Sequence, residues 1–549
     1  MGTTVFTNGT ILASYRADAA EHTAVAIEDG RVTAVGPTAL ALRPAADEVV
    51  DLEGGVLAPA FADGHAHPLQ GGLEKLGPQV RSCESVEEIV ACVREWADAH
   101  PEQEWIYGGS YDATLAPDGM FDARWLDAAV PDRPVVLRAW DYHTVWVNSE
   151  ALRRAGIDAR TPEPALGRIP RRPDGTPLGI LQEPGAVDLL LPFEPGRTHE
   201  ERVEALRLAT ADYAELGIAW VQDAWVETAE VEAYLEASAR GLLSTRMNLA
   251  LRADPVRWRD QVPEFVESRR RVEEVQDPLL TAGTVKVFVD GVIENHTAAM
   301  LEDYVDTPGD RGLPNWDARE LAAAAVTFDK LGFQLHLHAI GDAATRTALD
   351  VFEEVERANG PRDRRPVIAH VQVVDPSDLP RFGRLGVIAN FEPLWAQLDP
   401  MMLDLTLPRL GPERERLQYP IRTLHQTAGV SFGSDWPVSS ADWRPGVATA
   451  VTRQTDDRVP VDGWIPAERI PLTDALEAYS SGVAHQAFAR TSRGELRPGS
   501  APDLVWLDTD PRQVDPHDLR SVRVLGTWVA GVRRASAPLH HSIQRGSTT

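Results

Sequence analysis

VLAPAFADGHAH, at residues 56–67, is a short apolar run that ends in a pair of histidines. A run of this length, bounded by residues that favour turns, is typical of a buried β-strand. Successive side chains of a strand alternate between its faces, so His65 and His67 are expected on the same face. The stretch therefore predicts a strand that presents two imidazoles at its carboxyl end.

Seven further apolar runs follow, and helical stretches separate them. They are residues 218–224, 244–252, 284–291, 333–341, 366–374, 387–394 and 429–437. Strands that alternate with helices are typical of βα units and a parallel sheet. Eight of them close a barrel, so we predict an α/β fold with a (β/α)₈ TIM-like barrel over residues 58–487. A large insertion at about 70–205 would follow the first strand, and we expect it to cover the site.

Both ends of the chain resemble β-structure. VFTNGTIL and AVAIEDGRVTAVG, near the start, alternate in polarity around Asn-Gly and Asp-Gly, which favour tight hairpins. PDLVWLD and SVRVLGTWVAGV repeat this pattern near the end. We therefore predict one small β-sandwich domain built from residues 1–57 and 488–540, with two unrelated β appendages as the alternative. Residues 541–549 are predicted to be a disordered tail.

The composition is that of a soluble globular protein, with 43% hydrophobic and 25% charged residues among 549. A formal net charge of −29 argues against nucleic acid and anionic membranes as partners. No apolar run reaches membrane-spanning length, and the start lacks the features of a signal peptide. Cys83 and Cys92 alone imply no disulfide framework. We expect a cytoplasmic protein, and we leave a homodimer open.

Metal-ligand residue types recur at the ends of the other predicted strands. Imidazole nitrogens and carboxylate oxygens suit zinc and its first-row neighbours. One His-x-His motif is weak support for a metal site, whereas ligand residues at several correctly ordered strand ends support it much more strongly. The predicted metal ligands are His65, His67, Lys286, His338, His370 and Asp435. Asp435, in GSDWP, is also the predicted catalytic proton shuttle, although an aspartate before a turn can instead cap a helix.

Lys286 stands among apolar residues in TVKVFVD. Lysine occurs elsewhere only at Lys75 and Lys330, and arginine supplies all the other basic side chains. Burial lowers the pKa of a lysine and frees a neutral amine, which can capture CO₂ as a carbamate. Because a carbamate offers two oxygens, it can bridge two metal ions. The alternative is an ordinary ion pair with a carboxylate such as Asp290.

Other polar and aromatic residues are candidates for substrate contacts. His143, in DYHTVWVNS of the insertion, could bind substrate or be a satisfied polar residue, and His296 is a second candidate. His336 points inward but deeper than His338, so we expect it to support a ligand. The tryptophans that could line a pocket, of which Trp225 and Trp436 are the main candidates, are Trp140, Trp146, Trp225, Trp395 and Trp436.

At these residues the chain resembles the amidohydrolase superfamily, in the branch called amidohydrolase family 3, which includes N-substituted formamide deformylases. The matching motifs are APAFADGHAHP (58–68), DYHTVWVNSEALRRAGI (141–157), VKVFVDG (285–291), HAIGDAA (338–344), AHVQ (369–372), GSDWPV (433–438) and GSAPDLVWLD (499–508). The resemblance implies one or two zinc-type ions. His65, His67 and Asp435 would bind the first, and carboxylated Lys286 would bridge to a second at His338 and His370.

The chain departs from the family pattern at two places. Glu392 stands in FEP where glutamine is expected, and Asn295-His296 stands where an arginine motif is common. These departures bear on which substrate is bound, and they do not affect the prediction of hydrolysis. Glu183, in QEPGA, is an alternative to Lys286 as the bridging carboxylate.

The expected activity is hydrolysis of a non-peptide C–N bond, in a small amide or formamide-like substrate, by a metal-activated hydroxide. Asp435 would act first as general base and then as general acid. A mononuclear deaminase would want His-x-x-Glu after the fifth strand, but the chain has His338-Ala-Ile-Gly-Asp342. An esterase would use the same site. An inactive binding protein should have lost ligands, and none is missing.

Overall fold

Eight parallel strands form the central sheet of the protein, and the computed structural model describes residues 2–536. The strands are β6 (Phe61–Ala66), β11 (Ile218–Val226), β12 (Arg246–Arg252), β13 (Leu280–Phe288), β14 (Gln334–Ala339), β15 (Val367–His370), β16 (Ile388–Phe391) and β17 (Gly429–Phe432). Each pairs with its successor in the chain. The eight predicted barrel strands are confirmed. The first begins at Phe61 rather than at Val56.

The two edges of this sheet meet at their carboxyl ends. The backbone amide of Asp435, beyond β17, donates to the carbonyl of His65 in β6 over 2.7 Å. A Cβ at Gly433 would lie 2.8 Å from the backbone nitrogen of His65, so only glycine permits this approach. The sheet is thus a nearly closed TIM-like barrel, and its closure brings the last strand against the first.

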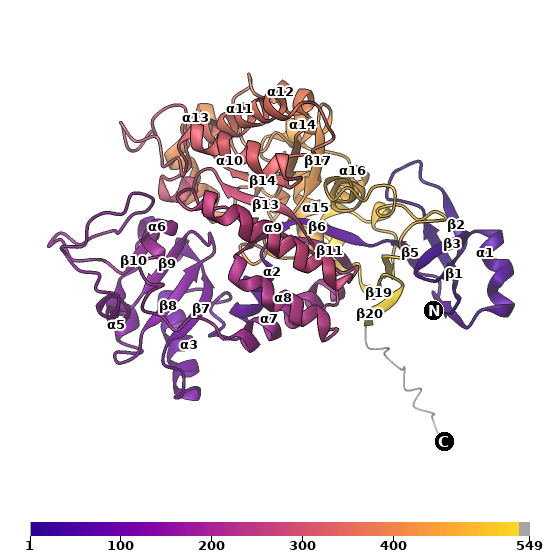
Figure 1. Cartoon of the computed structure of the whole chain (residues 1–549), viewed down its shortest axis with the longest axis horizontal. Helices are drawn as coiled ribbons and strands as arrows, with labels where there is room; N and C mark the ends of the chain where they lie inside the picture. The colour runs from indigo at the N-terminus through magenta and orange to yellow at the C-terminus, as the bar shows by residue number, and fades with distance from the viewer. Residues whose placement is uncertain (1, 537–549) are drawn as a thin grey trace.

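Helices between the strands cover the outside of the barrel (Figure 1). They include α7 (His199–Glu215), α8 (Val231–Ala239), α9 (Trp258–Val275), α10 (Ala318–Lys330), α11 (Asp342–Asn359), α12 (Leu379–Leu385), α14 (Ile421–His425) and α15 (Trp443–Thr452). In α11, Ala348, Leu349, Phe352 and Val355 recur at helical spacing and are buried. Burying a large apolar side chain contributes roughly 1.5–3 kcal/mol. Gly360, with φ 76°, follows the helix.

Both ends of the described chain enter a second eight-stranded sheet. Its strands are β1 (Thr4–Leu12), β2 (Glu21–Glu28), β3 (Arg31–Val35), β4 (Glu48–Asp51), β5 (Val56–Pro59), β18 (Leu504–Leu507), β19 (Val524–Val529) and β20 (Val532–Ser536). β5 pairs with β18 and joins the two ends. Phe6 of β1 contacts Trp528 of β19 across the sheet, at 5.0 Å between ring centroids. One shared sheet excludes two separate appendages, whereas the sandwich form stays a prediction.

The insertion after β6 forms a lobe of its own beside the barrel (Figure 1). Its sheet has the order β10 (Ile180–Gln182), β9 (Thr144–Val147), β8 (Val135–Ala139) and β7 (Ile106–Tyr111). The lobe has separate apolar cores, which include Trp146 and helix α3 (Val86–Ala99). Helix α2 (Pro68–Glu74), inside the predicted insertion, instead packs against α7 of the barrel.

No helix among residues 2–536 is long and apolar enough to cross a membrane. The predicted disordered tail at 541–549 lies outside the described residues, as do residues 537–540 of the predicted sandwich.

Candidate functional site

Three predicted ligands from different strands form one buried cluster at the carboxyl end of the barrel. His65 belongs to β6, His370 ends β15, and Asp435 follows β17. Each can offer a ligand atom, and these atoms lie within 4.8 Å of one another. His67 joins them, because its Nε2 lies 2.8 Å from Oδ1 of Asp435. The cluster has the donor types of a zinc-like site.

The electrostatics of the cluster fit a bound cation. Burial is the largest cause that lowers the pKa of each histidine predicted to bind metal, to about 3 for His370, so the rings are neutral. Nδ1 of His67 is buried and forms no hydrogen bond within residues 2–536, and within the same residues Oδ1 of Asp435 is contacted only by His67 and His65. Buried lone pairs without a donor are unfavourable, and a metal ion placed among them removes that penalty.

Carboxylates contact His370 of this cluster and the neighbouring His338. Nδ1 of His370 lies 2.9 Å from Oε2 of Glu392, and Nδ1 of His338 lies 3.2 Å from Oδ1 of Asp290. These contacts leave Nε2 of each ring free to bind a metal, an arrangement common around metal-ligating histidines. Glu392, the departure noted in the FEP motif, is therefore a buried partner of a candidate ligand. The ring of Trp395 stacks on His370 at 5.3 Å.

Lys286 is fully buried, with 0% of its surface exposed. Its Nζ lies 3.3 Å from Nε2 of His65 and 4.5 Å from the ring centroid of Phe288. It forms no salt bridge within residues 2–536, because Asp290 instead accepts the backbone amides of Ala299, Ile340 and Gly341. Burial lowers the pKa of Lys286 to about 7, although nearby carboxylates oppose the shift. The alternative ion pair with Asp290 is therefore wrong.

Asp435 points at the histidines rather than capping a helix. Burial opposes its ionisation, but the interactions with His67 and His65 outweigh burial and hold the pKa of Asp435 well below its usual range. Its φ is 52° and that of His370 is 76°, values that non-glycine residues seldom adopt. Such strained backbone clusters at functional sites. His336 lies behind this cluster, with Nε2 2.7 Å from Nδ1 of His65.

The cluster opens into a cavity of about 430 Å³, within the usual range for small-molecule sites. Part of its wall comes from the insertion, namely Arg81, Asp112, Trp140, Asp141, Tyr142 and His143. The insertion therefore supplies part of the cavity wall. Contact between these residues and a substrate stays a prediction.

The structure brings some predicted substrate residues into the cavity and leaves others out. His143 and Trp225 line it, together with Trp140 and Trp395. His296, Trp146 and Trp436 are not among its lining residues. Nε2 of His296 lies 2.8 Å from Asp306, and Trp436 packs against Tyr213.

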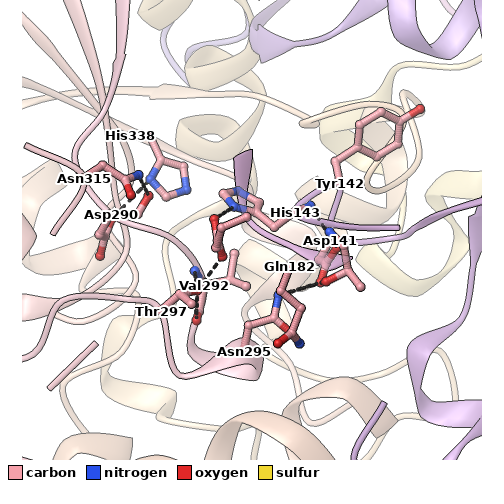
Figure 2. Close-up of polar contacts among 12 residues, drawn as sticks. Asp141, Tyr142, His143, Gln182, Asp290, Val292, Asn295, Thr297, Asn315 and His338 are labelled. Carbon is pink, nitrogen blue, oxygen red and sulfur yellow. Dashed lines mark hydrogen bonds and ion pairs between the residues drawn. The ribbon is translucent and has the colours of Figure 1, made fainter. Parts of the chain in front are cut away.

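His143 faces His338 from the insertion, with 5.3 Å between the ring centroids (Figure 2). Its Nδ1 lies 2.7 Å from Oε2 of Glu183, and the Thr297 hydroxyl donates to Oε1 of Glu183. Burial lowers the pKa of His143, but Glu183 and then Asp141 outweigh burial and raise it to about 9. Both oxygens of Glu183 are thus engaged, and Glu183 does not line the cavity. We therefore retain Lys286, not Glu183, as the candidate bridge.

Several lining residues had no role in the sequence-based prediction, namely Asp112, Glu294, Gln372, Asp399 and Tyr419. Gln372 stands in the AHVQ motif, two residues beyond His370, and that position was a usable signal. The others lie in loops and short helices, where no periodic pattern distinguishes a lining side chain from an exposed one.

Comparison with known proteins agrees with this geometry. Residues 48–535 match the model of a family described as the amidohydrolase family. Protein LONG AFTER FAR-RED 3 of Arabidopsis thaliana is 32% identical, over 96% of this chain and 90% of its own. The N-substituted formamide deformylase of Arthrobacter pascens is 28% identical, over 93% and 94%.

Among solved structures, a metal-dependent hydrolase from Pyrococcus horikoshii OT3 is similar, with a TM-score of 0.75. It is 25% identical, and the match covers 94% of this chain and 99% of that one. Family, fold and ligand cluster agree with one another. The chain therefore belongs to the amidohydrolase family.

Proposed function

We propose that the protein hydrolyses a non-peptide C–N bond in a small amide or formamide-like substrate. The observation that carries this proposal is the buried cluster of His65, His370 and Asp435 at the floor of an apolar-walled cavity. Similarity to a formamide deformylase along nearly its whole length supports the choice of bond. Screening N-formyl and N-acyl amines for amine release tests it directly.

The ligand residues would hold metal at two adjoining positions. His65, His67 and Asp435 would hold one ion, and His338 and His370 would hold a second. Lys286 lies beside His65 at 3.3 Å and, once carboxylated, would bridge the two positions. Zinc is the metal that we propose, because nitrogen and oxygen donors suit it. A bound zinc ion supplies a Lewis acid that lowers the pKa of water and polarises a carbonyl oxygen.

The side chains of the protein would manage the protons and the orientation of the substrate. Asp435 is ionised at neutral pH, so its free oxygen can accept a proton from water and deliver it to the leaving nitrogen. His143 is protonated, with Nδ1 held by Glu183, so its Nε2–H can donate to the carbonyl oxygen on which negative charge develops. The insertion keeps bulk water away from this step.

A mononuclear deaminase finds less support in the structure. Such an enzyme would want a glutamate shortly after His338. The acid nearest to that position is Asp342, which accepts a hydrogen bond from the backbone amide of Leu301 at 2.8 Å. It does not line the cavity. Asp342, the first acid after β14, is therefore not positioned to donate a proton to a substrate in this cavity.

The first prediction concerns metal content. Protein purified without chelators should hold up to two zinc ions per chain by elemental analysis, because the neutral histidines and Asp435 converge on one point. Chelation should abolish amine release and lower the melting temperature, since a bound metal stabilises the folded state. Metal-free protein that binds no added zinc by calorimetry would contradict the proposal.

The second prediction concerns His143. His143→Ala should lower kcat/KM by about 10²-fold, the typical effect of removing one donor to a developing oxyanion. Metal content should not change, because His143 is not a ligand. His296→Ala is the matched control and should retain nearly full activity, because His296 pairs with Asp306 outside the cavity. Unchanged kinetics in His143→Ala would exclude the proposed role.

A further inference from the structure

Three carboxylates face the cavity from segments that are distant in the chain. Asp112 precedes η2 (Ala113–Leu115), Glu294 lies in η5 (Ile293–Asn295), and Asp399 precedes the π-helix η7 (Met401–Thr406). The Thr406 hydroxyl donates to Glu294, and η7 contacts both other segments. The fold therefore brings these carboxylates together.

None of the three carboxylates forms a salt bridge within residues 2–536. One oxygen of Asp399 accepts the amide of Met402 at 2.8 Å, and one oxygen of Asp112 accepts the amide and hydroxyl of Thr114. The second oxygen of each makes no hydrogen bond within the same residues. Both groups therefore keep an acceptor free for a ligand.

Positive side chains near the three carboxylates are directed elsewhere. Arg81 also lines the cavity, but its guanidinium donates to the carbonyl of Pro437 and to Glu74. Arg409 is the cation whose charge lowers the pKa of Glu294, but its guanidinium donates to the backbone carbonyl of Leu405. Arg453 donates to the backbone carbonyl of Tyr419. None of these arginines pairs with the three carboxylates, so within residues 2–536 their charges are not neutralised by a direct ion pair.

Tyr419 is an independent sign of a ligand at the same place. It lines the cavity, only 1% of its surface is exposed, and its hydroxyl forms no hydrogen bond within residues 2–536. Burial, followed by the charges of Glu294 and other carboxylates that include Asp399, raises the pKa of Tyr419 well above its usual range. A buried phenol usually finds a hydrogen-bond partner, so a bound molecule is the natural partner here.

Aromatic rings complete the surroundings. Trp140 and Trp395 line the same cavity, and Nε1 of Trp140 is buried without a partner. Aromatic faces attract cations, and binding sites for ammonium groups combine such faces with carboxylates. The apolar side chains of Val292, Ile340 and Met402 also line the cavity and would suit a methylene chain.

We propose that Asp112, Glu294, Asp399 and Tyr419 form a subsite, hereafter the acidic subsite, that binds a positively charged amine on the substrate. The preferred substrate class is then a monoacylated or monoformylated diamine, whose amide reacts while its distant ammonium group is held. This inference rests on the proposed amide hydrolysis and specifies the substrate of the same site.

The test compares three N-formylalkylamines of equal length that end in an ammonium, a methyl or a carboxylate group, in a series of spacer lengths. At the best length, kcat/KM for the ammonium substrate should exceed that for the methyl substrate by about 10- to 100-fold, as expected for charge-assisted hydrogen bonds. The carboxylate substrate should be the poorest. Equal values for all three would overturn the acidic subsite.

Substitutions in the acidic subsite test whether its residues cause the preference for the ammonium substrate. Asp399→Asn and Glu294→Gln should lower the ratio of ammonium to methyl turnover towards one, and Tyr419→Phe should lower this ratio less. Asp404→Asn is the matched control, because Asp404 lies in the same π-helix η7 but is exposed to solvent. A preference unchanged in Asp399→Asn and Glu294→Gln would place the recognition elsewhere.

The pH dependence provides a second readout of the same experiment. Burial, and then repulsion from Glu294 and Asp112, raises the pKa of Asp399 to about 6 against the hydrogen bond from Met402. Because Asp399 is negative only above this pH, the ratio of ammonium to methyl turnover should fall as the pH drops below about 6. Asp399→Asn should remove this dependence. Changes at the metal ligands cancel in the ratio.

Binding of a probe that has no amide tests the acidic subsite independently of the proposed amide hydrolysis. n-Pentylammonium carries the charge and the N–H donors that the subsite would bind, but it has no amide to be hydrolysed. Calorimetry should show that it binds the wild-type protein more tightly than Asp399→Asn. If the probe binds in this way and no amide is hydrolysed, the proposed function fails and the acidic subsite stands. If amides are hydrolysed and the probe does not bind, the acidic subsite is wrong.

Discussion

Lys286→Ala is expected to lower kcat/KM by at least ~10³-fold, because several kcal/mol of Lewis-acid stabilisation are lost. It should also release at least one metal ion per chain, measured by elemental analysis. The reason is chemical. The buried neutral Nζ would attack the carbon of CO₂. An N–C bond would form, the electron pair of one C=O π bond would move to its oxygen, and a proton would leave the nitrogen. The resulting carbamate has two oxygens, and each can bind one metal ion.

Companion variants separate this role from simple packing. Lys286→Arg should not restore activity, since a guanidinium neither reacts with CO₂ nor binds a cation. Formate or acetate, added with zinc, should partly restore turnover in Lys286→Ala, because a small carboxylate can occupy the vacated space. Lys330→Ala, at the exposed end of α10, is the control and should behave as the wild type.

Direct observation of the modified lysine completes this test. Protein loaded with zinc in ¹³C-labelled bicarbonate should show a carbamate carbon by NMR, and Lys286→Ala should not. An experimental structure with metals bound and an unmodified ammonium at Lys286 would contradict the carbamate. The hydrolase proposal would survive that result, because the histidines and Asp435 would still bind metal.

Asp435→Asn should lower kcat by about 10²–10⁴-fold, the usual range for loss of a general base. The amide keeps the shape of the side chain but cannot accept and return the proton. Because Asp435 also faces His65 and His67 at 3.4 and 2.8 Å, some metal affinity should be lost as well. Metal content measured beside turnover separates the two effects.

Saturating zinc provides the decisive comparison for Asp435→Asn. If turnover remains low when metal content is restored, proton transfer is the step that was lost. If full metal loading restores turnover, Asp435 is only a ligand. Asp462→Asn changes an exposed carboxylate and should have no effect on either measurement. Wild-type turnover in Asp435→Asn without added zinc would remove Asp435 from the mechanism.

The sequence alone determined the strands of the barrel, because each strand is a local apolar run between helical stretches. It also determined most of the candidate ligands. In a parallel barrel all strands end on one rim, so residues such as His338 and His370 must converge there once the strand order is known. The first strand shows the limit. Residues 56–59 pair with β18, and no local pattern reveals a partner more than four hundred residues away.

Only the tertiary structure decided which groups meet across segments. Asp290 lies four residues after Lys286 in the sequence, yet three backbone amides and His338 engage it. Lys286 has no carboxylate partner within residues 2–536 and contacts His65 instead. Glu392, a departure from the motif by sequence, proved to be the partner of His370. Side-chain partners depend on how loops from different strands pack, and this packing is not encoded in any periodic pattern.

The acidic subsite shows most clearly what the tertiary structure decided and the sequence alone did not. Asp112, Glu294 and Asp399 are ordinary carboxylates in a chain with a net charge of −29. By sequence they cannot be distinguished from the exposed acids that give the protein its charge. They become a candidate recognition site only because the insertion, the loop after β13 and the segment after β16 meet over one cavity. In that cavity, burial and mutual repulsion raise the free energy of the unpaired negative charges.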